Sequence, residues 1–246
     1  MVPRPANGGD GPVIPVTLVV LTLNEIDGVT AIIPKLPTHC LDEILVVDGG
    51  STDGTVEFFA SRGVRVIRQP RRGRGEAFRL AVEHARHDRL VFFSPDGNED
   101  PGDIPRLIEG LAAGYDMVIA SRFRPGARSE DDDKFLFASR RWGNLLFTWL
   151  VNRLCARGGA HISDTINGYR AITRAAFRRL APDADGYAIE FQMSIRALQL
   201  GLRVLEIPTL EAPRIGRGVS KLNAIPVGLR FFALLVREWA RPRARR

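Results

Sequence analysis

The fold is constrained most by a series of short, continuous apolar runs, each rich in β-branched residues and each followed by a polar turn. The first run is Val16–Leu23, and the later ones are Glu43–Val47, Val64–Ile67, Leu90–Phe93 and Met117–Ala120. Runs without alternation are typical of strands that are covered on both faces, as in parallel sheets. Helical stretches separate them, at Thr55–Ser61, Glu76–Ala85 and Ile104–Ala113. The pattern predicts an α/β fold, with a mostly parallel sheet flanked by helices on both faces.

The second half of the chain has a different character. Phe135–Leu154 predicts a long helix, in which Trp142 and Trp149 are expected to pack rather than to bind a ligand. Two more helices, a strand and a basic loop follow, at Thr173–Leu180, Ile189–Leu200, Arg203–Ile207 and Arg214–Lys221. We expect a flexible leader at residues 1–12, the α/β domain at residues 13–222, and an apolar C-terminal helix with a basic tail at residues 223–246.

Composition excludes several classes of protein. The 246 residues are 45% hydrophobic and 26% charged, which is typical of a globular domain and not of a disordered or fibrous chain. The net charge is +7, but the last ten residues hold five arginines and one glutamate, so that +4 of it lies there. A basic tail on a nearly neutral body argues against a nucleic-acid partner and suits an anionic substrate or membrane surface.

The cellular location is also limited by the sequence. Two cysteines are too few for a disulfide framework, and Met1–Pro15 lacks the pattern of a signal peptide. No window reaches the roughly 18–20 apolar residues that a membrane-spanning helix needs. Ala224–Val236 with the arginines after it is typical of an interfacial helix, although a core helix with a solubilising tail explains it equally well. We expect a cytoplasmic protein that is either soluble or peripheral at the inner face of the membrane.

Polar and acidic residues follow four of the predicted strands. They are Asn24-Glu25, Asp48–Thr55, Ser94–Pro101 and Ser121-Arg122-Phe123. Any one of these turns is explained by strand termination and helix capping, and Asp53 is expected to act only as a cap. The carboxyl ends of parallel strands meet at one edge of a sheet, where ligands of such folds bind. Four polar turns at that edge therefore favour a ligand site.

Carboxylates beside several basic residues suit a substrate that combines a sugar, a diphosphate and a divalent metal. Mg²⁺ or Mn²⁺ usually binds one or two carboxylates together with substrate phosphates, and Asp96 is the natural candidate for this. The candidates for contacting phosphate oxygens are Arg122, Arg140, Arg141, Arg214, Arg217 and Lys221. The dinucleotide-binding fingerprint is not met, and no Cys/His spacing indicates zinc.

The motifs together resemble the family 2 glycosyltransferases, and most closely their dolichol- and polyprenyl-phosphate sugar (mannose or glucose) synthases. The resemblance rests on Thr22–Glu25, Val46–Thr55, Ser94-Pro95-Asp96 and Ser121-Arg122. It continues in Asp164–Arg170, similar to a D-x-T-S-G-F-R motif, in Gly186–Met193, and in Gly218–Leu222, similar to a G-x-S-K-L loop. It covers about residues 15–235 and implies the glycosyltransferase A type of α/β fold.

The resemblance also implies roles for individual residues. Asn24, Glu25 and Asp48 match positions that hold the nucleobase and ribose, and Asp96 matches the second acid of D-x-D, which binds metal and the sugar diphosphate. Asn98 lies where a polar side chain assists that metal. Arg122 and one of Arg140 or Arg141 match arginines that hold the acceptor phosphate. Arg214 and Lys221 would close over the donor diphosphate and stabilise the leaving group.

Three positions depart from the family pattern. Ser94 replaces the first acid of D-x-D, Gly49 replaces the second acid of D-D-G-S, and the Q-x-E start of a helix has become Glu190-Phe191-Gln192. The loss at Ser94 weakens the expected affinity for metal and leaves the metal requirement open. An atypical subgroup is indicated, in which donor and acceptor can differ from those of the named synthases.

The kind of acceptor follows from the absence of an E-D pair near Asp164. Transfer to a hydroxyl normally needs a general base, whereas an acceptor phosphate is already an anionic nucleophile. We therefore expect inverting transfer from a nucleotide-diphosphate donor to a polyprenyl-phosphate-type lipid. One alternative is a soluble or polysaccharide hydroxyl acceptor, with Asp164 as the base. The other is a weakly active sugar-nucleotide-binding subunit.

Overall fold

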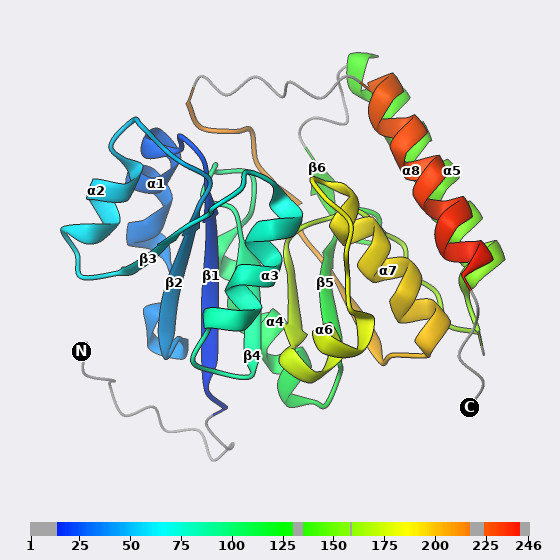
Figure 1. Ribbon diagram of the computed structural model, residues 1–246, viewed down its shortest axis with the longest axis horizontal. Helices are drawn as coiled ribbons and strands as arrows, with labels where there is room; N and C mark the ends of the chain where they lie inside the picture. The colour runs from blue at the N-terminus through cyan, green and yellow to red at the C-terminus, as the bar shows by residue number, and fades with distance from the viewer. Residues whose placement is uncertain (1–13, 130–134, 158, 217–223, 242–246) are drawn as a thin grey trace.

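The sheet is the frame on which the rest of the molecule is built. In the computed structural model, which describes residues 14–129, 135–157, 159–216 and 224–241, seven strands form one sheet in the order β3-β2-β1-β4-β7-β5-β8 (Figure 1). They are β1 (Val16–Thr22), β2 (Glu43–Asp48), β3 (Arg65–Arg68), β4 (Arg89–Phe93), β5 (Met117–Ser121), β7 (Arg170–Thr173) and β8 (Val204–Pro208). A small parallel ladder joins β6 (Arg128–Ser129) to β9 (Leu210–Glu211).

Helices cover both faces of this sheet (Figure 1). They are α1 (Ile26–Ile32), α2 (Thr55–Ala60), α3 (Arg74–His84), α4 (Ile104–Ala112), α5 (Phe135–Cys155), α6 (Arg174–Leu180), α7 (Ala188–Leu200) and α8 (Ala224–Ala240), with short 3-10 turns at Ile33–Lys35, Thr38–Cys40 and Pro101–Asp103. Side chains of α1, α2 and α4 bury one face, and those of α3, α6 and α7 bury the other. The predicted α/β fold is confirmed.

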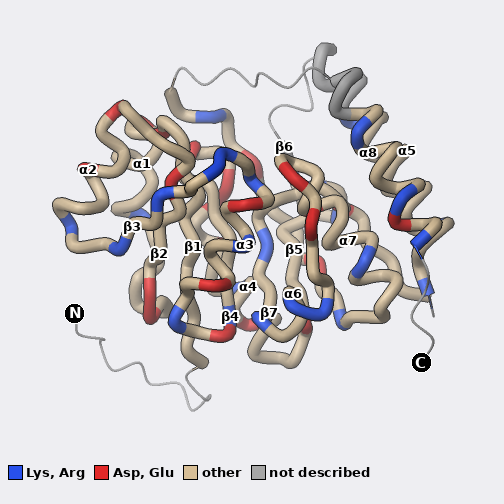
Figure 2. The backbone as a smooth tube through the Cα atoms, viewed as in Figure 1, with Lys and Arg blue, Asp and Glu red and all other residues tan. Residues whose placement is uncertain are grey.

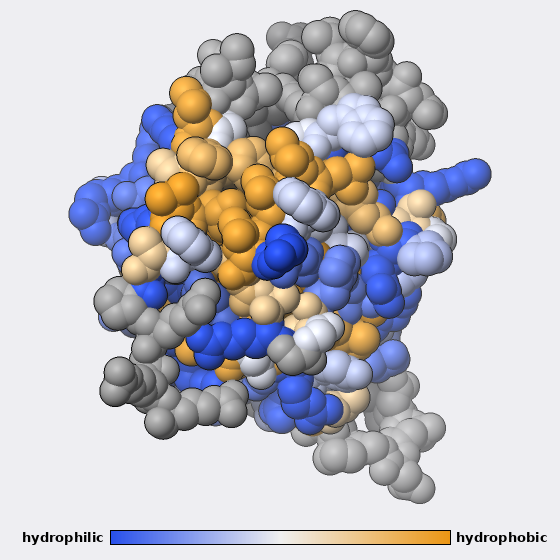
Figure 3. All heavy atoms as spheres, turned by 90° about the vertical axis from the view of Figure 1, so that its right-hand side faces the viewer, coloured by the Kyte–Doolittle hydropathy of each residue, from blue (hydrophilic) through white to orange (hydrophobic). Residues whose placement is uncertain are grey.

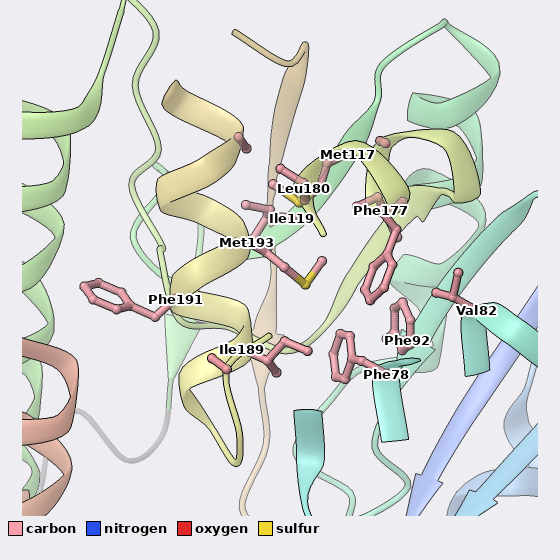
Figure 4. Close-up of a cluster of buried hydrophobic side chains, with 14 of the residues drawn as sticks. Phe78, Val82, Phe92, Met117, Ile119, Phe177, Leu180, Ile189, Phe191 and Met193 are labelled. Atoms are coloured by element: carbon pink, nitrogen blue, oxygen red, sulfur yellow. The ribbon is translucent and has the colours of Figure 1, made fainter. Parts of the chain in front are cut away.

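The strands alternate their side chains between two apolar clusters. In β1, Val19 and Leu21 belong to the cluster under α3 and α7, while Leu18 and Val20 belong to the cluster under α1 and α4. Because both faces are covered, the run is continuous in sequence although it alternates in space. Figure 4 shows the first cluster, in which Phe78 of α3 stacks on Phe92 with the ring centroids 3.9 Å apart.

Strand β7 is an element that the apolar runs did not predict. It pairs antiparallel with β4 on one side and with β5 on the other. Its sequence is short and starts with Arg170, so that it lacks a continuous apolar run. The Arg170 guanidinium is fully buried and donates to the backbone oxygens of Asn167 (2.9 Å, from Nε) and Glu190 (3.2 Å, from Nη1). Burial lowers the pKa of Arg170 to about 10.

The helices α5 and α8 form an outer layer over α7 (Figure 1). Phe147 of α5, Phe191 of α7 and Phe231 of α8 make pairwise ring contacts at centroid distances of 4.9 to 5.8 Å. The expectation that the α5 tryptophans pack inside is wrong, since Trp142 is 71% and Trp149 is 61% exposed. None of the helices within the described residues is long and apolar enough to cross a membrane.

Candidate functional site

The carboxyl ends of β1, β2, β4 and β5 lie at the same edge of the sheet, because β1 pairs parallel with β2 and β4, and β7 is antiparallel to both β4 and β5. Val20 of β1 is opposite both Val46 of β2 and Phe93 of β4, so the turns that follow these three strands start at similar heights. Figure 2 shows acidic and basic segments close together along this edge. β1 lies between β2 and β4, the position at which the chain order reverses and at which open α/β sheets bind ligands.

Asp48 organises the turn after β2 with its own carboxylate. Its Oδ2 accepts the backbone N–H groups of Gly50 and Ser51, both at 2.9 Å, and its Oδ1 accepts the hydroxyls of Thr22 (3.2 Å) and Ser51. Asn24 adopts a left-handed backbone conformation, with φ 56°, and its Oδ1 accepts the N–H of Thr52 at 2.8 Å. These bonds hold together the turns that follow β1 and β2. They use side-chain oxygens of Asn24 and Asp48, two of the residues that we predicted to hold the nucleobase and ribose.

Asp53 and Glu25 lie at the starts of the first two helices. Asp53 accepts the N–H of Thr55 and the N–H of Ile26, both at 3.0 Å, and so satisfies the first N–H group of α2 and of α1, whose N-cap residues are Gly54 and Glu25. Glu25 is half-buried next to it. Burial, and after it the negative charge of Asp96, raises the pKa of Glu25 to about 7. The side chain therefore titrates near neutral pH.

Asp96 lies at the centre of the edge, in the turn after β4. The residue is buried, and its Oδ2 lies 3.2 Å from Nε of Arg214, which comes from the other end of the chain. The backbone oxygen of Asp96 accepts the N–H of Ile215 at 2.8 Å. A Cβ at Gly97 would lie 2.6 Å from Cγ1 of Ile215, so the turn needs glycine there. We call residues 212–216 the strap, because they lie directly against this turn.

Asn98 fastens the other end of the strap. Its Nδ2 donates to the backbone oxygen of Ala212 at 2.7 Å, and its own backbone oxygen accepts the N–H of Ala212 at 3.1 Å. Its backbone N–H donates to Oδ1 of Asp96 at 3.1 Å. The structure therefore brings Asp96, Asn98 and Arg214 together, while the predicted metal role of Asn98 remains a prediction.

A second set of charged groups surrounds Ser94, the residue in place of the first acid of D-x-D. Glu99 is buried and its Oε2 accepts the backbone N–H of Ser94 at 2.7 Å. Burial, and after it the charge of Asp96, raises the pKa of Glu99 well above its ordinary value. Nη1 of Arg74 lies 3.4 Å from the Ser94 hydroxyl. A carboxyl group is thus retained beside Ser94, supplied by a different residue.

Arg74 also forms an ion pair with Glu190 at the start of α7. Glu190 is buried, and its second oxygen, Oε2, has no hydrogen-bond partner among the described residues. A Cβ at Gly168 would lie 2.0 Å from Nη2 of Arg74, so glycine there makes room for the pair. Sequence reasoning missed Arg74, Glu99 and Glu190 as site residues. Their signals were an arginine between two glycines at a helix start, a second acid in the Asp96 turn, and the exchanged order Glu190-Phe191-Gln192.

Arg122 and Asp164 lie together at the end of β5. Nε and Nη2 of Arg122 donate to the two oxygens of Asp164 at 2.8 and 3.0 Å, and the backbone N–H of Arg122 adds a third bond at 3.1 Å. Burial alone would raise the pKa of Asp164, but the charge and hydrogen bonds of Arg122 hold it below its ordinary value. In this arrangement Asp164 is not poised to take a proton, and it holds Arg122 in one orientation.

The other predicted basic residues are spread more widely. Arg141 is exposed on α5. Lys221 lies outside the described residues, as do the side chain of Arg140, the leader at residues 1–12 and the last arginines of the tail. Among the described residues no three His, Cys, Asp or Glu side chains form a ready-made cation site. The donor set at Asp96 suits a divalent cation that arrives with a diphosphate, because such cations take much of their coordination from substrate phosphates.

Comparison with known proteins agrees with this architecture. The family model described as "Glycosyl transferase family 2" matches residues 17–180. Glycosyltransferase AglJ of Haloferax volcanii is 32% identical, over 88% of this chain and 69% of its own. Undecaprenyl-phosphate mannosyltransferase of Micrococcus luteus is 30% identical, over 87% of this chain and 89% of its own, and polyprenol monophosphomannose synthase of Mycolicibacterium smegmatis is 29% identical, over 91% and 86%.

Solved structures show the same fold. Glucosyl-3-phosphoglycerate synthase from Mycobacterium tuberculosis, in complex with Mn²⁺, UDP and glucosyl-3-phosphoglycerate, superposes with a TM-score of 0.71 and 22% identity, covering 94% of this chain and 82% of that one. The fold is of the glycosyltransferase A type, as predicted. The chain belongs to glycosyl transferase family 2.

Proposed function

We propose that the protein transfers a sugar, with inversion, from a nucleoside-diphosphate donor to a polyprenyl-phosphate lipid. The observation that carries the proposal is the buried carboxylate of Asp96 at the carboxyl edge of the sheet, held 3.2 Å from Arg214 of the strap. A carboxylate and a guanidinium at this distance are suited to a metal-bound diphosphate, the one as metal ligand and the other as phosphate ligand. The names of two relatives, at 29% and 30% identity, support the lipid acceptor.

The donor half of the site is assigned as follows. Asn24, Glu25 and Asp48 would shape the pocket for the nucleoside, and Asp96, assisted by Asn98, would hold Mg²⁺ or Mn²⁺. The cation supplies charge that stabilises the departing diphosphate. The neighbour that binds Mn²⁺ together with UDP supports this metal. Arg214 pairs with Asp96 in the described structure and would turn to the diphosphate when a donor occupies the site, together with Lys221 of the same loop.

The acceptor half would be built from cations. A phosphate oxygen of the lipid attacks the anomeric carbon, and the bond from that carbon to the diphosphate breaks with its electron pair going to the diphosphate. No proton has to be removed, because the acceptor is already an anion. The bidentate pair that occupies both oxygens of Asp164 supports a phosphate over a hydroxyl acceptor. Arg122, held by Asp164, and Arg140 or Arg141 would bind the acceptor phosphate, with Asp164 as a positioning residue.

The test is nucleoside diphosphate release from a panel of UDP- and GDP-sugars with Mg²⁺ or Mn²⁺, with and without a short-chain polyprenyl phosphate. We expect release that requires both the lipid phosphate and the metal. Asp96→Asn should lower it by about 10²–10³-fold. Asp100→Asn is the matched control, since Asp100 lies in the same turn and caps a 3-10 helix there with its side chain. Asparagine keeps that cap, so activity should remain.

Each other outcome has a defined meaning. Release that does not depend on the lipid would overturn the acceptor and favour a hydroxyl acceptor or hydrolysis. Donor binding without release under any condition would favour a sugar-nucleotide-binding subunit. Equal losses in the two variants would mean that the turn, and not the Asp96 carboxylate, carries the effect.

A further inference from the structure

Helices α5 and α8 carry large apolar side chains on the faces that point away from the body of the protein. On α5 they are Trp142, Leu146 and Trp149, and on α8 they are Leu229, Phe232, Val236 and Trp239. These seven side chains are between 46% and 71% exposed. Their spacings of three and four residues place each set on one side of its helix. We call the seven residues the aromatic face.

The aromatic face is additional to the surface that the two helices use for packing. The buried side of α8 is formed by Phe231, Leu234 and Leu235, and that of α5 includes Val151 and Cys155. Each helix is therefore apolar on two opposite sides, and only one of them contributes to the core. Exposed apolar patches of this kind are unusual on a monomer and mark interaction sites.

The exposed apolar residues of α5 and those of α8 form one surface because the two helices lie side by side. α5 and α8 contact each other as well as α7, and Phe147 meets Phe231 at their junction. Figure 3 looks onto this side of the molecule and shows hydrophobic side chains gathered over it, with hydrophilic ones around and among them. The sequence contains three tryptophans, and all three belong to the aromatic face.

The charges of the two helices are mostly positive. Their sequences hold five arginines, at positions 140, 141, 153, 230 and 237, against one acid, Glu238. That acid is buried; it pairs with Arg196 of α7 and also lies 3.2 Å from Arg237 and 3.7 Å from Arg241, so the two helices keep a net positive charge. Arg153, Arg230 and Arg237 are exposed, and Arg241 follows directly after α8. An occupant of this face therefore has to be both apolar and anionic.

We propose that the aromatic face is the surface by which this protein docks on an anionic lipid bilayer, with the tryptophans at the level of the headgroups and the arginines on lipid phosphates. Tryptophan prefers this interfacial level, and each arginine near an anionic surface strengthens binding. A second copy of the chain is a poorer occupant, because an isologous contact would bring the two sets of arginines together. The proposal deepens the proposed function and rests on it, since a membrane is where a polyprenyl phosphate resides.

The connection to the donor site is short. The strap that contacts Asp96 ends at Gly216, and α8 begins at Ala224, so few residues separate the leaving-group side of the site from the docking helix.

The first experiment needs no variant, because all intrinsic tryptophan fluorescence comes from the aromatic face. Purified full-length protein is mixed with vesicles of phosphatidylcholine alone or of phosphatidylcholine with phosphatidylglycerol, without donor or acceptor. We expect a blue shift of the emission and quenching by brominated acyl chains with the anionic vesicles, reduced by high salt. The same vesicles should carry the protein in flotation. No spectral change and no flotation would overturn the proposal.

The second experiment separates docking from catalysis. Trp149→Gln combined with Phe232→Gln should lower vesicle affinity at least about tenfold. Leu210→Gln, at an exposed leucine on β9 outside the face, should leave it unchanged. Both proteins should keep their turnover with a short-chain acceptor in free solution, which tests the proposed function independently of the membrane. Full vesicle binding by the double variant would overturn the proposal. The proposal would also be overturned if the wild-type protein dimerised with increasing concentration and the double variant did not, because the aromatic face would then bind a second copy of the chain.

Discussion

At the scale of single residues, the environment of Asp96 is dominated by carboxyl groups that are hard to ionise. Glu25 and Glu99 both have a raised pKa, in each case because of burial first and the charge of Asp96 second. Arg214 is the cation that faces Asp96 in the described structure. A divalent cation at Asp96 would favour the ionised forms of both neighbours, so the protonation of this cluster and the occupation of the site are linked.

The raised pKa of Glu25 predicts a particular dependence of stability on pH. The folded protein keeps the Glu25 proton up to about pH 7, whereas the unfolded chain releases it near 4.5. The contribution of Glu25 to the free energy of unfolding is therefore greatest below pH 4.5 and falls as the pH rises to 7. Glu25→Gln should remove this fall, worth about 1–2 kcal/mol at a half-buried group once solvent screening is included. Urea unfolding of the wild-type and Glu25→Gln proteins at pH 5 and pH 8 measures this change in the free energy of unfolding. The same change with pH in both proteins would contradict the raised pKa of Glu25.

At the scale of elements, helix α1 and the Asp96 turn are held at a distance that only glycine permits. A Cβ on Gly28 would lie 2.2 Å from the backbone oxygen of Pro95 and 3.0 Å from Cα of Asp96. Both neighbours are backbone atoms, so a rotamer change cannot relieve the contact. This approach brings Glu25, which immediately precedes α1, to the turn that carries Asp96.

Gly28→Ala should therefore separate α1 from the turn. Alanine is the better helix former by about 1 kcal/mol, but the steric contact outweighs this, and we expect a net loss of about 2–3 kcal/mol in the free energy of unfolding. Activity should fall further than stability alone explains, because Glu25 and Asp96 move apart. Gly143→Ala in α5 is the matched control: among the described residues, no atom beyond the adjacent residues and the neighbouring helix backbone lies within 4 Å of the added Cβ, so the helix should gain about 0.5–1 kcal/mol. Chemical denaturation measures the free energy of unfolding of the two variants, and turnover assays measure their activity. A Gly28→Ala protein more stable than the wild type would contradict the steric argument.

The elements differ in how far the sequence predicts them. The parallel strands were predictable because continuous apolar runs are a local signal, and the Asp96 turn because its residues are adjacent. β7 was not, since Arg170–Thr173 is short and polar at its start and gains its place from pairing with β4 and β5. The Arg74–Glu190 pair joins residues 116 apart, which only the tertiary fold brings together. The helical spacing of Trp142 and Trp149 placed them on one stripe, but both stripes of α5 are apolar and spacing alone does not tell which one faces the core.

At the scale of the whole molecule, the outer helix α8 is attached by a buried polar cluster as well as by apolar packing. Glu238 accepts from Nε and Nη2 of Arg196, both at 2.7 Å, and from Nε2 of Gln192 at 2.6 Å. Gln192 and Arg196 lie on α7, which packs on the central sheet. The exchanged order Glu190-Phe191-Gln192 thus has a structural counterpart: Glu190 is directed to Arg74 and the Asp96 edge, and Gln192 to the helix that carries the docking face.

Removing the Glu238 carboxylate should loosen α8 while the sheet stays intact. Among the described residues, Glu238→Ala leaves the Arg196 guanidinium with Asp183 as its one acidic partner, and we expect a loss of about 2–4 kcal/mol in the local stability of α8. Hydrogen exchange of α8 peptides should accelerate by about 30-fold or more, since 2 kcal/mol corresponds to that ratio, with β1 and β4 unchanged. Glu109→Ala, at an exposed acid on α4, is the control and should change neither. If α8 keeps its protection against hydrogen exchange in Glu238→Ala, then the apolar contacts of Phe231, Leu234 and Leu235 are enough to hold the helix in place. The Glu238→Ala protein should in that case still bind anionic vesicles.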